Sequence, residues 1–276
     1  MLLVKNIYFS YNNTKVLEDI SFHLGKGELC GLFGPNGSGK TTLFKCCLKF
    51  IRPDWGSVRF QGRDIKKLKT REMAKQVSYV PQSHHPPFPF TVKEMVLMGR
   101  TPHLNRFYLP DNQDKKLVEQ AMEMINISPL AGEPYDILSG GQQQMVLIAR
   151  AIAQNTGLIF LDEPTSALDF KNQVIIWKTL RKIADQGISI LACSHDPNHV
   201  AWFCDSTVVL GPSGLVAKGD PDQVICQDLM DKIYEDTCLV KDLEDMKMIV
   251  PKGLSRHRAQ IVDFPMNQKG ETSYGV

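Results

Sequence analysis

The chain has 276 residues, of which 43% are hydrophobic, and 32 basic and 30 acidic residues give it a formal net charge of +2. This length and composition permit one large or two small globular domains with a sizeable core. The nearly balanced charge excludes an overall field that would attract nucleic acid or anionic lipid, so partners must be inferred from individual sites.

The apolar runs are too short to cross a bilayer. The longest, residues 157–161 and 188–193, fall far below the roughly 20 residues that a spanning helix needs, and they predict buried parallel strands. The opening MLLVKNIYFSY predicts no secretory signal, because it has neither a basic start nor a cleavage site. The seven cysteines are scattered without a C-x-x-C pair, so we expect reduced and mostly buried thiols.

Short strands dominate residues 2–65, where apolar and polar residues alternate between turns. Within this region GELCGLFG, residues 27–34, predicts a buried strand that ends in a glycine-rich loop. The helical pattern TTLFKCCLKF, residues 41–50, follows directly, so the three parts form one strand-loop-helix unit.

A helical subdomain is predicted over about residues 91–150. It follows SHHPPFPF, residues 83–90, whose three prolines exclude regular structure and indicate a linker. Apolar residues then recur at three-four spacing in residues 91–100 and 114–127.

Strands and helices alternate again after this subdomain, which predicts a mostly parallel sheet. The expected elements are a strand at 157–162, a helix at about 173–186, a strand at 188–195 and a hairpin at 207–219. We find no internal repeat, so residues 1–252 are expected to form one domain. The polar residues 253–276 predict a loose tail.

GPNGSGKTT, residues 34–42, matches G-x-x-x-x-G-K-[ST] between a predicted strand and helix. The glycines allow backbone N–H groups to surround phosphates, and the helix adds its positive end. A glycine turn followed by a chance Lys-Thr is the alternative. The residues expected to bind nucleotide are Gly34, Pro35, Asn36, Gly37, Ser38, Gly39, Lys40 as the cation, Thr41 also as a Mg²⁺ ligand, and Thr42.

GLIFLDEP ends a buried strand with two adjacent carboxylates, at the sheet edge where ligands bind. Asp162 is the candidate to hold Mg²⁺ through water, and Glu163 is the candidate general base for an attacking water. Taken alone, the motif would favour a pair of solvated acids.

LSGGQ, residues 138–142, precedes a helical pattern, so Ser139 is predicted to cap a helix. Free N–H groups of Gly140 and Gly141, with the helix dipole, would form a second anion site. A capped helix that binds no ligand is the alternative for an isolated motif.

Together these residues resemble the ATP-binding cassette (ABC) family, from about Leu2 to Pro251. The family motifs occur in the family order: Tyr11, GPNGSGKTT, Gln82 in VPQ, LSGGQ, LDEP, SALD ending at Asp169, and His195 in CSHD. The resemblance implies an α/β fold with a P-loop (RecA-like) core and mostly parallel sheet, an N-terminal antiparallel β region and the inserted helical subdomain. It also implies ATP and Mg²⁺ as ligands.

The resemblance assigns roles that the residues alone do not, because a lone Tyr, Gln or His is more often packed or solvated. It implies a head-to-tail dimer in which GPNGSGKTT of one copy and Ser139, Gly140, Gly141 and Gln142 of the other hold the same γ-phosphate. Tyr11 would stack on adenine. Gln82 would contact Mg²⁺ and the attacking water, His195 would hold the γ-phosphate, and Asp169 would link the two sites.

The segment FPFTVKEMVLMGRTPHL, residues 88–104, resembles importers of ferric siderophores, haem and cobalamin, most specifically in M-G-R-x-P-H. This resemblance implies integral membrane permease subunits, a substrate-binding protein as an indirect partner, no nucleic acid, and a peripheral location on the cytoplasmic face of the membrane. We expect residues 88–100 to form a permease groove that is sensitive to charge at Phe90 or Met95. An equally good interpretation is that Phe88 and Phe90 are ordinary aromatic residues of the core.

A non-transport ABC ATPase, such as an iron-sulfur assembly or ribosome-associated factor, is the alternative function. The single cassette and compact insertion argue against it, because translation factors of the family carry two cassettes and DNA-repair members carry a long coiled coil.

Overall fold

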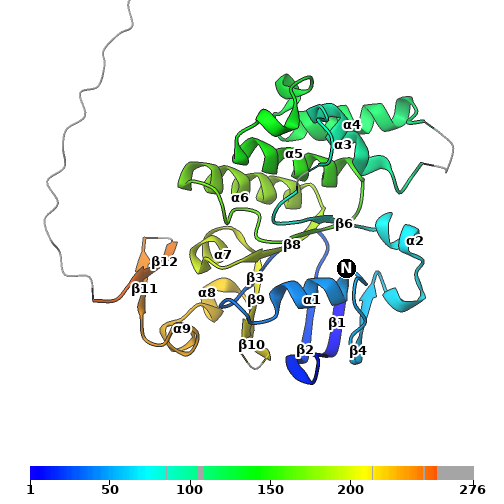
Figure 1. The fold of residues 1–276 in the computed structure, drawn as a ribbon. Helices are drawn as coiled ribbons and strands as arrows, with labels where there is room; N and C mark the ends of the chain where they lie inside the picture. The colour runs from blue at the N-terminus through cyan, green and yellow to red at the C-terminus, as the bar shows by residue number, and fades with distance from the viewer. Residues whose placement is uncertain (85, 105–108, 213, 245, 254–276) are drawn as a thin grey trace, which may run out of the picture.

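The computed structural model describes residues 1–84, 86–104, 109–212, 214–244 and 246–253 (Figure 1). Within these ranges the chain forms sheets of six, four and two strands. Apart from Gly253, the predicted tail lies outside the described residues. Within the same ranges, no helix combines the length and apolar character that a bilayer span requires.

The six-stranded sheet forms the centre of the molecule, in the order β10-β9-β3-β8-β7-β6 (Figure 1). Its first five strands in chain order pair in parallel, and β10 is antiparallel to β9. All residues of β3, β7 and β8 are buried, as expected when both faces of a sheet are covered. The mostly parallel sheet and the final hairpin are therefore confirmed. The strands are β3 (Leu29–Phe33), β6 (Val77–Val80), β7 (Leu158–Leu161), β8 (Ser189–Ser194), β9 (Ser206–Gly211) and β10 (Gly214–Gly219).

Three helices follow strands of this sheet directly: α1 (Lys40–Cys47), α6 (Phe170–Asp185) and α7 (Pro197–Phe203). The predicted start of α6 near residue 173 is wrong by three residues. The Asp169 side chain accepts a hydrogen bond from the Asn172 N–H at 2.8 Å and caps the helix before Phe170.

The predicted N-terminal β region is an antiparallel sheet in the order β2-β1-β4-β5. Burial alternates along β1, where Leu2 and Val4 are buried and Leu3 is exposed, so one face packs on the core. The elements of this region are β1 (Leu2–Tyr11), β2 (Thr14–Leu24), β4 (Trp55–Phe60), β5 (Arg63–Asp64), η1 (Ile65–Lys67) and α2 (Thr70–Ala74).

Helices form a separate layer above α6 (Figure 1). This layer confirms the helical subdomain of the expected fold class. Val92, Met95 and Val96 of α3 are fully buried in its core, so the predicted docking role of Met95 is wrong. The elements are α3 (Val92–Leu97), η2 (Met98–Arg100), α4 (Asn112–Met124), η3 (Ser128–Leu130), η4 (Tyr135–Ile137) and α5 (Gly140–Ala153).

The M-G-R-x-P-H segment fixes η2 against the C-terminal end of α5. A Cβ atom on Gly99 would lie 2.2 Å from the Arg150 carbonyl oxygen, so only glycine permits this approach. Arg100 is buried and donates to the Ala153 carbonyl at 2.8 Å, and His103 Nε2 lies 2.8 Å from the Gln154 carbonyl. Arg100 is therefore a packing residue, and its predicted place in a docking surface is wrong.

The C-terminal elements pack on α7, beside the central sheet (Figure 1). The sequence patterns did not predict them. They are α8 (Pro221–Val224), α9 (Gln227–Tyr234) and the two-stranded antiparallel sheet of β11 (Cys238–Leu243) and β12 (Met246–Pro251).

All seven cysteines are free and five are buried, which confirms that they are mostly buried. Burial raises the pKa of Cys30 and Cys46 to about 12.

Candidate functional site

Residues 34–42, called here the phosphate loop, comprise the connection from β3 to α1 and the first turn of α1. Gly34, Gly37 and Gly39 have φ angles of 155°, 83° and 91°, and a Cβ on Gly34 would lie 2.1 Å from the Leu210 carbonyl oxygen. The loop therefore requires glycine at residue 34. Helix α1 begins without a side-chain cap, so its first N–H groups remain available to an anion.

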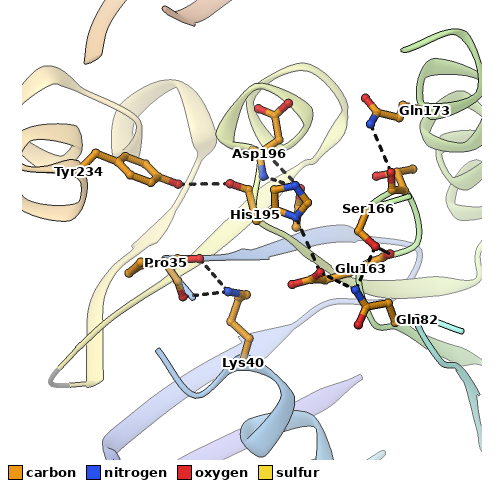
Figure 2. A network of polar contacts seen from close by, with 12 residues as sticks. Pro35, Lys40, Gln82, Glu163, Ser166, Gln173, His195, Asp196 and Tyr234 are labelled. Carbon is orange, nitrogen blue, oxygen red and sulfur yellow. Dashed lines mark hydrogen bonds and ion pairs between the residues drawn. The ribbon is translucent and has the colours of Figure 1, made fainter. Parts of the chain in front are cut away.

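Lys40 is the first residue of α1 and is 6% exposed. Its Nζ donates to the carbonyl oxygens of Gly34 at 2.7 Å and Pro35 at 3.0 Å (Figure 2). The ammonium is thus held over the loop by neutral acceptors, and no salt bridge involving it occurs in the described part of the chain. A phosphate would supply the missing negative charge.

Asp162 and Glu163 follow β7 at the carboxyl edge of the sheet, as predicted. Burial, and after it the charge of Glu163, raises the pKa of Asp162, while hydrogen bonds from Tyr79, Thr41 and Cys193 lower it in part. The Tyr79 hydroxyl lies 3.4 Å from Asp162 Oδ2. Burial likewise raises the pKa of Tyr79 to about 12, so this hydroxyl stays protonated and can donate.

Glu163 has a φ angle of 47°, in the left-handed region that a non-glycine residue rarely adopts. Such strain is characteristic of functional sites, where the surrounding structure holds the residue in place. The two neighbouring side chains differ in burial, because Asp162 is 6% exposed and the Glu163 side chain is 20% exposed.

Two side chains from other segments reach the Glu163 carboxylate (Figure 2). Gln82 Nε2 donates to Glu163 Oε2 at 3.0 Å and to Ser166 Oγ at 3.1 Å. His195 Nδ1 lies 3.8 Å from Glu163 Oε2 and its side chain is 52% exposed. The structure therefore brings together Gln82, Glu163 and His195, three of the predicted residues, from segments far apart in the chain.

Ser139 caps α5, as predicted. Its Oγ accepts from the Gln142 N–H at 3.3 Å, and Gln142 Oε1 accepts from the Ser139 N–H at 3.0 Å. Gly140 is exposed, and Gly141 is buried against the Asn172 side chain.

The cap of α5 is separate from the phosphate loop within one copy of the chain. Gly140 lines a hollow of about 150 Å³ together with Gln82, Glu163 and Ser166, and no residue of 34–42 lines it. Across the described ranges, no hydrogen bond joins Ser139–Gln142 to that loop.

Two further predicted residues, Tyr11 and Asp169, contact other parts of the chain. Tyr11 ends β1, is 44% exposed and packs edge-to-face on Phe9 with ring centroids 4.7 Å apart. Asp169 accepts from both the backbone and the side chain of Asn172 as the cap of α6, which is a sufficient structural reason for its presence.

Sequence reasoning missed Ser166, Tyr79 and Tyr234, which contact Gln82, Asp162 and His195 respectively. The SALD motif contains Ser166 and could have indicated it. The other two are single tyrosines without a pattern of their own.

A family model described as "ABC transporter" matches residues 17–166. The chain belongs to the ABC transporter family. A probable iron chelatin transport ATP-binding protein of Helicobacter pylori is 36% identical over 252 residues, which cover 91% of this chain and 98% of that protein. The P-loop ATPase fold and the resemblance to importer subunits are thereby confirmed, and the chain is an ATP-binding and ATP-hydrolysing subunit.

Two solved structures of ABC proteins share the fold. A protein described as of the metal-chelate type, in an inward-facing conformation, matches with a TM-score of 0.80 and 32% identity, covering 91% of this chain and 96% of its own. A dimeric ATP-binding cassette bound to ADP and phosphate matches with a TM-score of 0.69 and 25% identity, covering 80% and 99%.

Proposed function

We propose that the chain drives the uptake of a metal chelate through a membrane permease, and that Glu163 activates the water that hydrolyses ATP. The observation that carries the catalytic part is the convergence of Gln82 and His195 on the strained Glu163, beside the buried Asp162. A base at this position can take a proton from water while the neighbouring loop holds the phosphates.

In this proposal the loop of residues 34–42 binds the phosphates of ATP. Lys40 exchanges its contacts with the Gly34 and Pro35 carbonyls for contacts with phosphate oxygens, and Thr42 contacts the α-phosphate. Ser38 Oγ is buried without a hydrogen-bond partner, so it is a further polar group that a ligand can satisfy.

The residues present fit Mg²⁺. A carboxylate whose pKa is raised by burial and by Glu163 gains most from a nearby cation, and Thr41 and Gln82 add oxygen ligands. Within the described ranges no three acidic, His or Cys side chains gather into a metal cluster, which suits an ion that takes few protein ligands and keeps water and phosphate as the others. When bound, Mg²⁺ would neutralise phosphate charge.

Gln82 and His195 both contact Oε2 of Glu163 and have different roles. Gln82 donates to the carboxylate and can orient the attacking water beside it. His195 is half exposed, so its ring is free to turn toward a γ-phosphate. Together they fix the carboxylate, the water and the phosphate in one line.

A second copy of the chain completes the site. The separation of Ser139–Gln142 from the phosphate loop supports a trans arrangement, in which the start of α5 in one copy binds the γ-phosphate held by the other. The related dimeric cassette with ADP and phosphate supports the same partner. Asp169 would then link the two sites, and Tyr11 would stack on adenine.

The permease partner fits a groove between the helical layer and the central sheet. This groove has a volume of about 390 Å³ and is lined by Phe50, Met73, Tyr79, Met98, Pro102 and Arg150, among others. Phe50 is 62% exposed, and Tyr79 contacts the buried Asp162. A short helix of a permease in this groove would therefore lie one residue from the metal-binding carboxylate. Phe88, which is 66% exposed, lies in the predicted docking segment but lines a different hollow, together with Phe90 and Tyr135.

The cargo class rests on similarity. The relatives described as acting on iron chelatin and as of the metal-chelate type support a ferric or related chelate, delivered by a substrate-binding protein. This function requires the chain to lie on the cytoplasmic face of the membrane, where ATP is available.

The experiment that tests the cargo is uptake of a ⁵⁵Fe-labelled siderophore by cells of the source organism whose chromosomal copy carries Glu163→Gln. Uptake should fall to the level of a deletion strain, while uptake of an amino acid stays unchanged. Equal loss of amino-acid uptake, or unchanged iron uptake with several siderophores, would contradict the proposal.

A further inference from the structure

The loop that carries His195 is two residues long. It lies between Ser194 at the end of β8 and Pro197 at the start of α7. Ser194 Oγ contacts both the N–H and the carbonyl of Asp196 at 3.1 Å, and Asp196 caps α7. Ser194 and Asp196, which flank His195, are therefore held in place by hydrogen bonds to each other.

The His195 carbonyl has a partner from a distant element. The Tyr234 hydroxyl, at the end of α9, donates to it at 3.3 Å (Figure 2). Burial, and after it the charge of Asp196, raises the pKa of Tyr234 to about 12, so the hydroxyl remains a donor at neutral pH. The tyrosine is itself fixed, because Thr237 donates to its carbonyl from both N–H and Oγ1.

The C-terminal sheet anchors this arrangement to α7. The Asn198 side chain bonds both backbone groups of Ile249, as donor at 3.2 Å and as acceptor at 2.8 Å. Trp202 Nε1 donates to the Lys247 carbonyl at 2.7 Å. β12 is thus bound to α7 by side-chain to backbone hydrogen bonds, and α9 is bound to the same sheet because the Gln227 side chain bonds the Cys238 carbonyl and the Val240 N–H of β11.

We propose that Tyr234 is a positioning residue for His195: its hydroxyl fixes the His195 backbone so that the exposed ring faces Glu163 and the γ-phosphate. This inference rests on the role proposed above for His195. The Tyr234 hydroxyl does not touch substrate, and its contribution is to keep the ring in one orientation during hydrolysis.

Tyr234→Phe tests the proposal, because it removes only the hydroxyl. In the purified full chain, kcat for ATP should fall about three- to tenfold, the range that one neutral hydrogen bond contributes, while KM for ATP and the melting temperature stay unchanged. Tyr8→Phe is the matched control, since the Tyr8 hydroxyl, on β1, has no hydrogen-bond partner among the described residues and should have no effect.

A double-mutant cycle with His195→Ala separates this inference from the proposed function. His195→Ala should lower kcat strongly, and adding Tyr234→Phe should lower it no further, because the hydroxyl acts only through the histidine. Wild-type kcat in Tyr234→Phe, a raised KM with unchanged kcat, or additive effects in the double variant would each overturn the positioning role while leaving His195 its own. Wild-type activity of His195→Ala would overturn the proposed role of His195 and this inference with it.

Discussion

Arg100 Nε donates to Asp114 Oδ1 at 2.8 Å, and the two side chains are only 7% and 10% exposed. The pair joins the first turn of α4 to η2, whose Met98 and Gly99 line the proposed permease groove. Burial raises the pKa of Asp114, but the hydrogen bond and charge of Arg100 and the Asp111 N–H outweigh it, so the pKa lies below the usual carboxyl value.

Asp114→Asn should lower the free energy of unfolding by about 3 kcal/mol at pH 7, because it leaves a buried guanidinium without its counter-charge. The matched control is Asp185→Asn in the exposed pair with Arg181, which should cost under about 1 kcal/mol. Urea unfolding of the nucleotide-free chain measures both.

The stability difference between wild type and Asp114→Asn should depend on pH in a way that follows from the lowered pKa of Asp114. A carboxyl group with a lowered folded-state pKa contributes stability above its unfolded pKa of about 3.9 and loses it as the pH falls through the folded value. The difference between wild type and Asp114→Asn should therefore be constant from pH 7 to 5 and narrow only in stronger acid. A difference that narrows above pH 5 would contradict the ion pair.

Lys40→Ala should weaken ATP binding by at least about tenfold and abolish turnover, because it removes the charge-assisted contacts to phosphate. Lys45→Ala is the control, since Lys45 lies on the same helix but is exposed, on the face away from the loop carbonyls. Fluorescent nucleotide titration measures the affinity. If the two variants bound ATP with equal affinity, Lys40 would not be a nucleotide-binding residue.

Asp162→Asn should make the nucleotide-free chain more stable at pH 7.5, by about 1 kcal/mol, while it removes the further stabilisation by Mg²⁺ and ATP. The reason is that burial and the charge of Glu163 disfavour the charged form of the Asp162 carboxyl, which has no salt-bridge partner within the described residues. Thermal unfolding with and without Mg²⁺-ATP measures both effects. A variant that Mg²⁺-ATP stabilises as strongly as wild type would exclude Asp162 as the metal residue.

The trans arrangement predicts complementation between two inactive variants. A mixed dimer of Lys40→Ala and Ser139→Arg has one site with an intact loop facing an intact α5 start, whereas either variant alone has none. ATPase activity of the mixture should exceed the sum of the separate activities. With mixed dimers verified by differential tags, activity equal to that sum would indicate a site complete within one copy.

The sequence predicted those parts of the fold in which turn residues and the alternation of apolar and polar residues form a clear local pattern. The strand-loop-helix unit at residues 27–50 and the hairpin at 207–219 are both present, because glycine turns and alternation determine them locally. β6 was not predicted, because VSYV is a run of only four residues, three of them buried, without alternation. α9, β11 and β12 are short, and their positions depend on contacts with α7 that only tertiary structure provides.

Local sequence patterns also could not show which residues of the predicted docking segment are buried, and this explains why the docking roles of Met95 and Arg100 were wrong. Apolar spacing in TVKEMVLMGR identifies a helix with an apolar face, but a face that packs in the core and one that binds a partner have the same spacing. Met95 is in the core, whereas Phe88 is exposed and Phe90 packs partly against the core. The residues that line the groove, such as Phe50 and Met73, come from other segments that no local pattern connects.

The role of Glu163 as general base is tested most directly by ATP hydrolysis in Glu163→Gln, compared with a Glu119→Gln control at an exposed surface pair. We expect Glu163→Gln to bind ATP with wild-type affinity, to lose about 10²- to 10⁴-fold in turnover, and to form a dimer with ATP but not with ADP on size-exclusion chromatography. Turnover within threefold of the control, at saturating ATP and Mg²⁺, would contradict the claim that Glu163 is the general base.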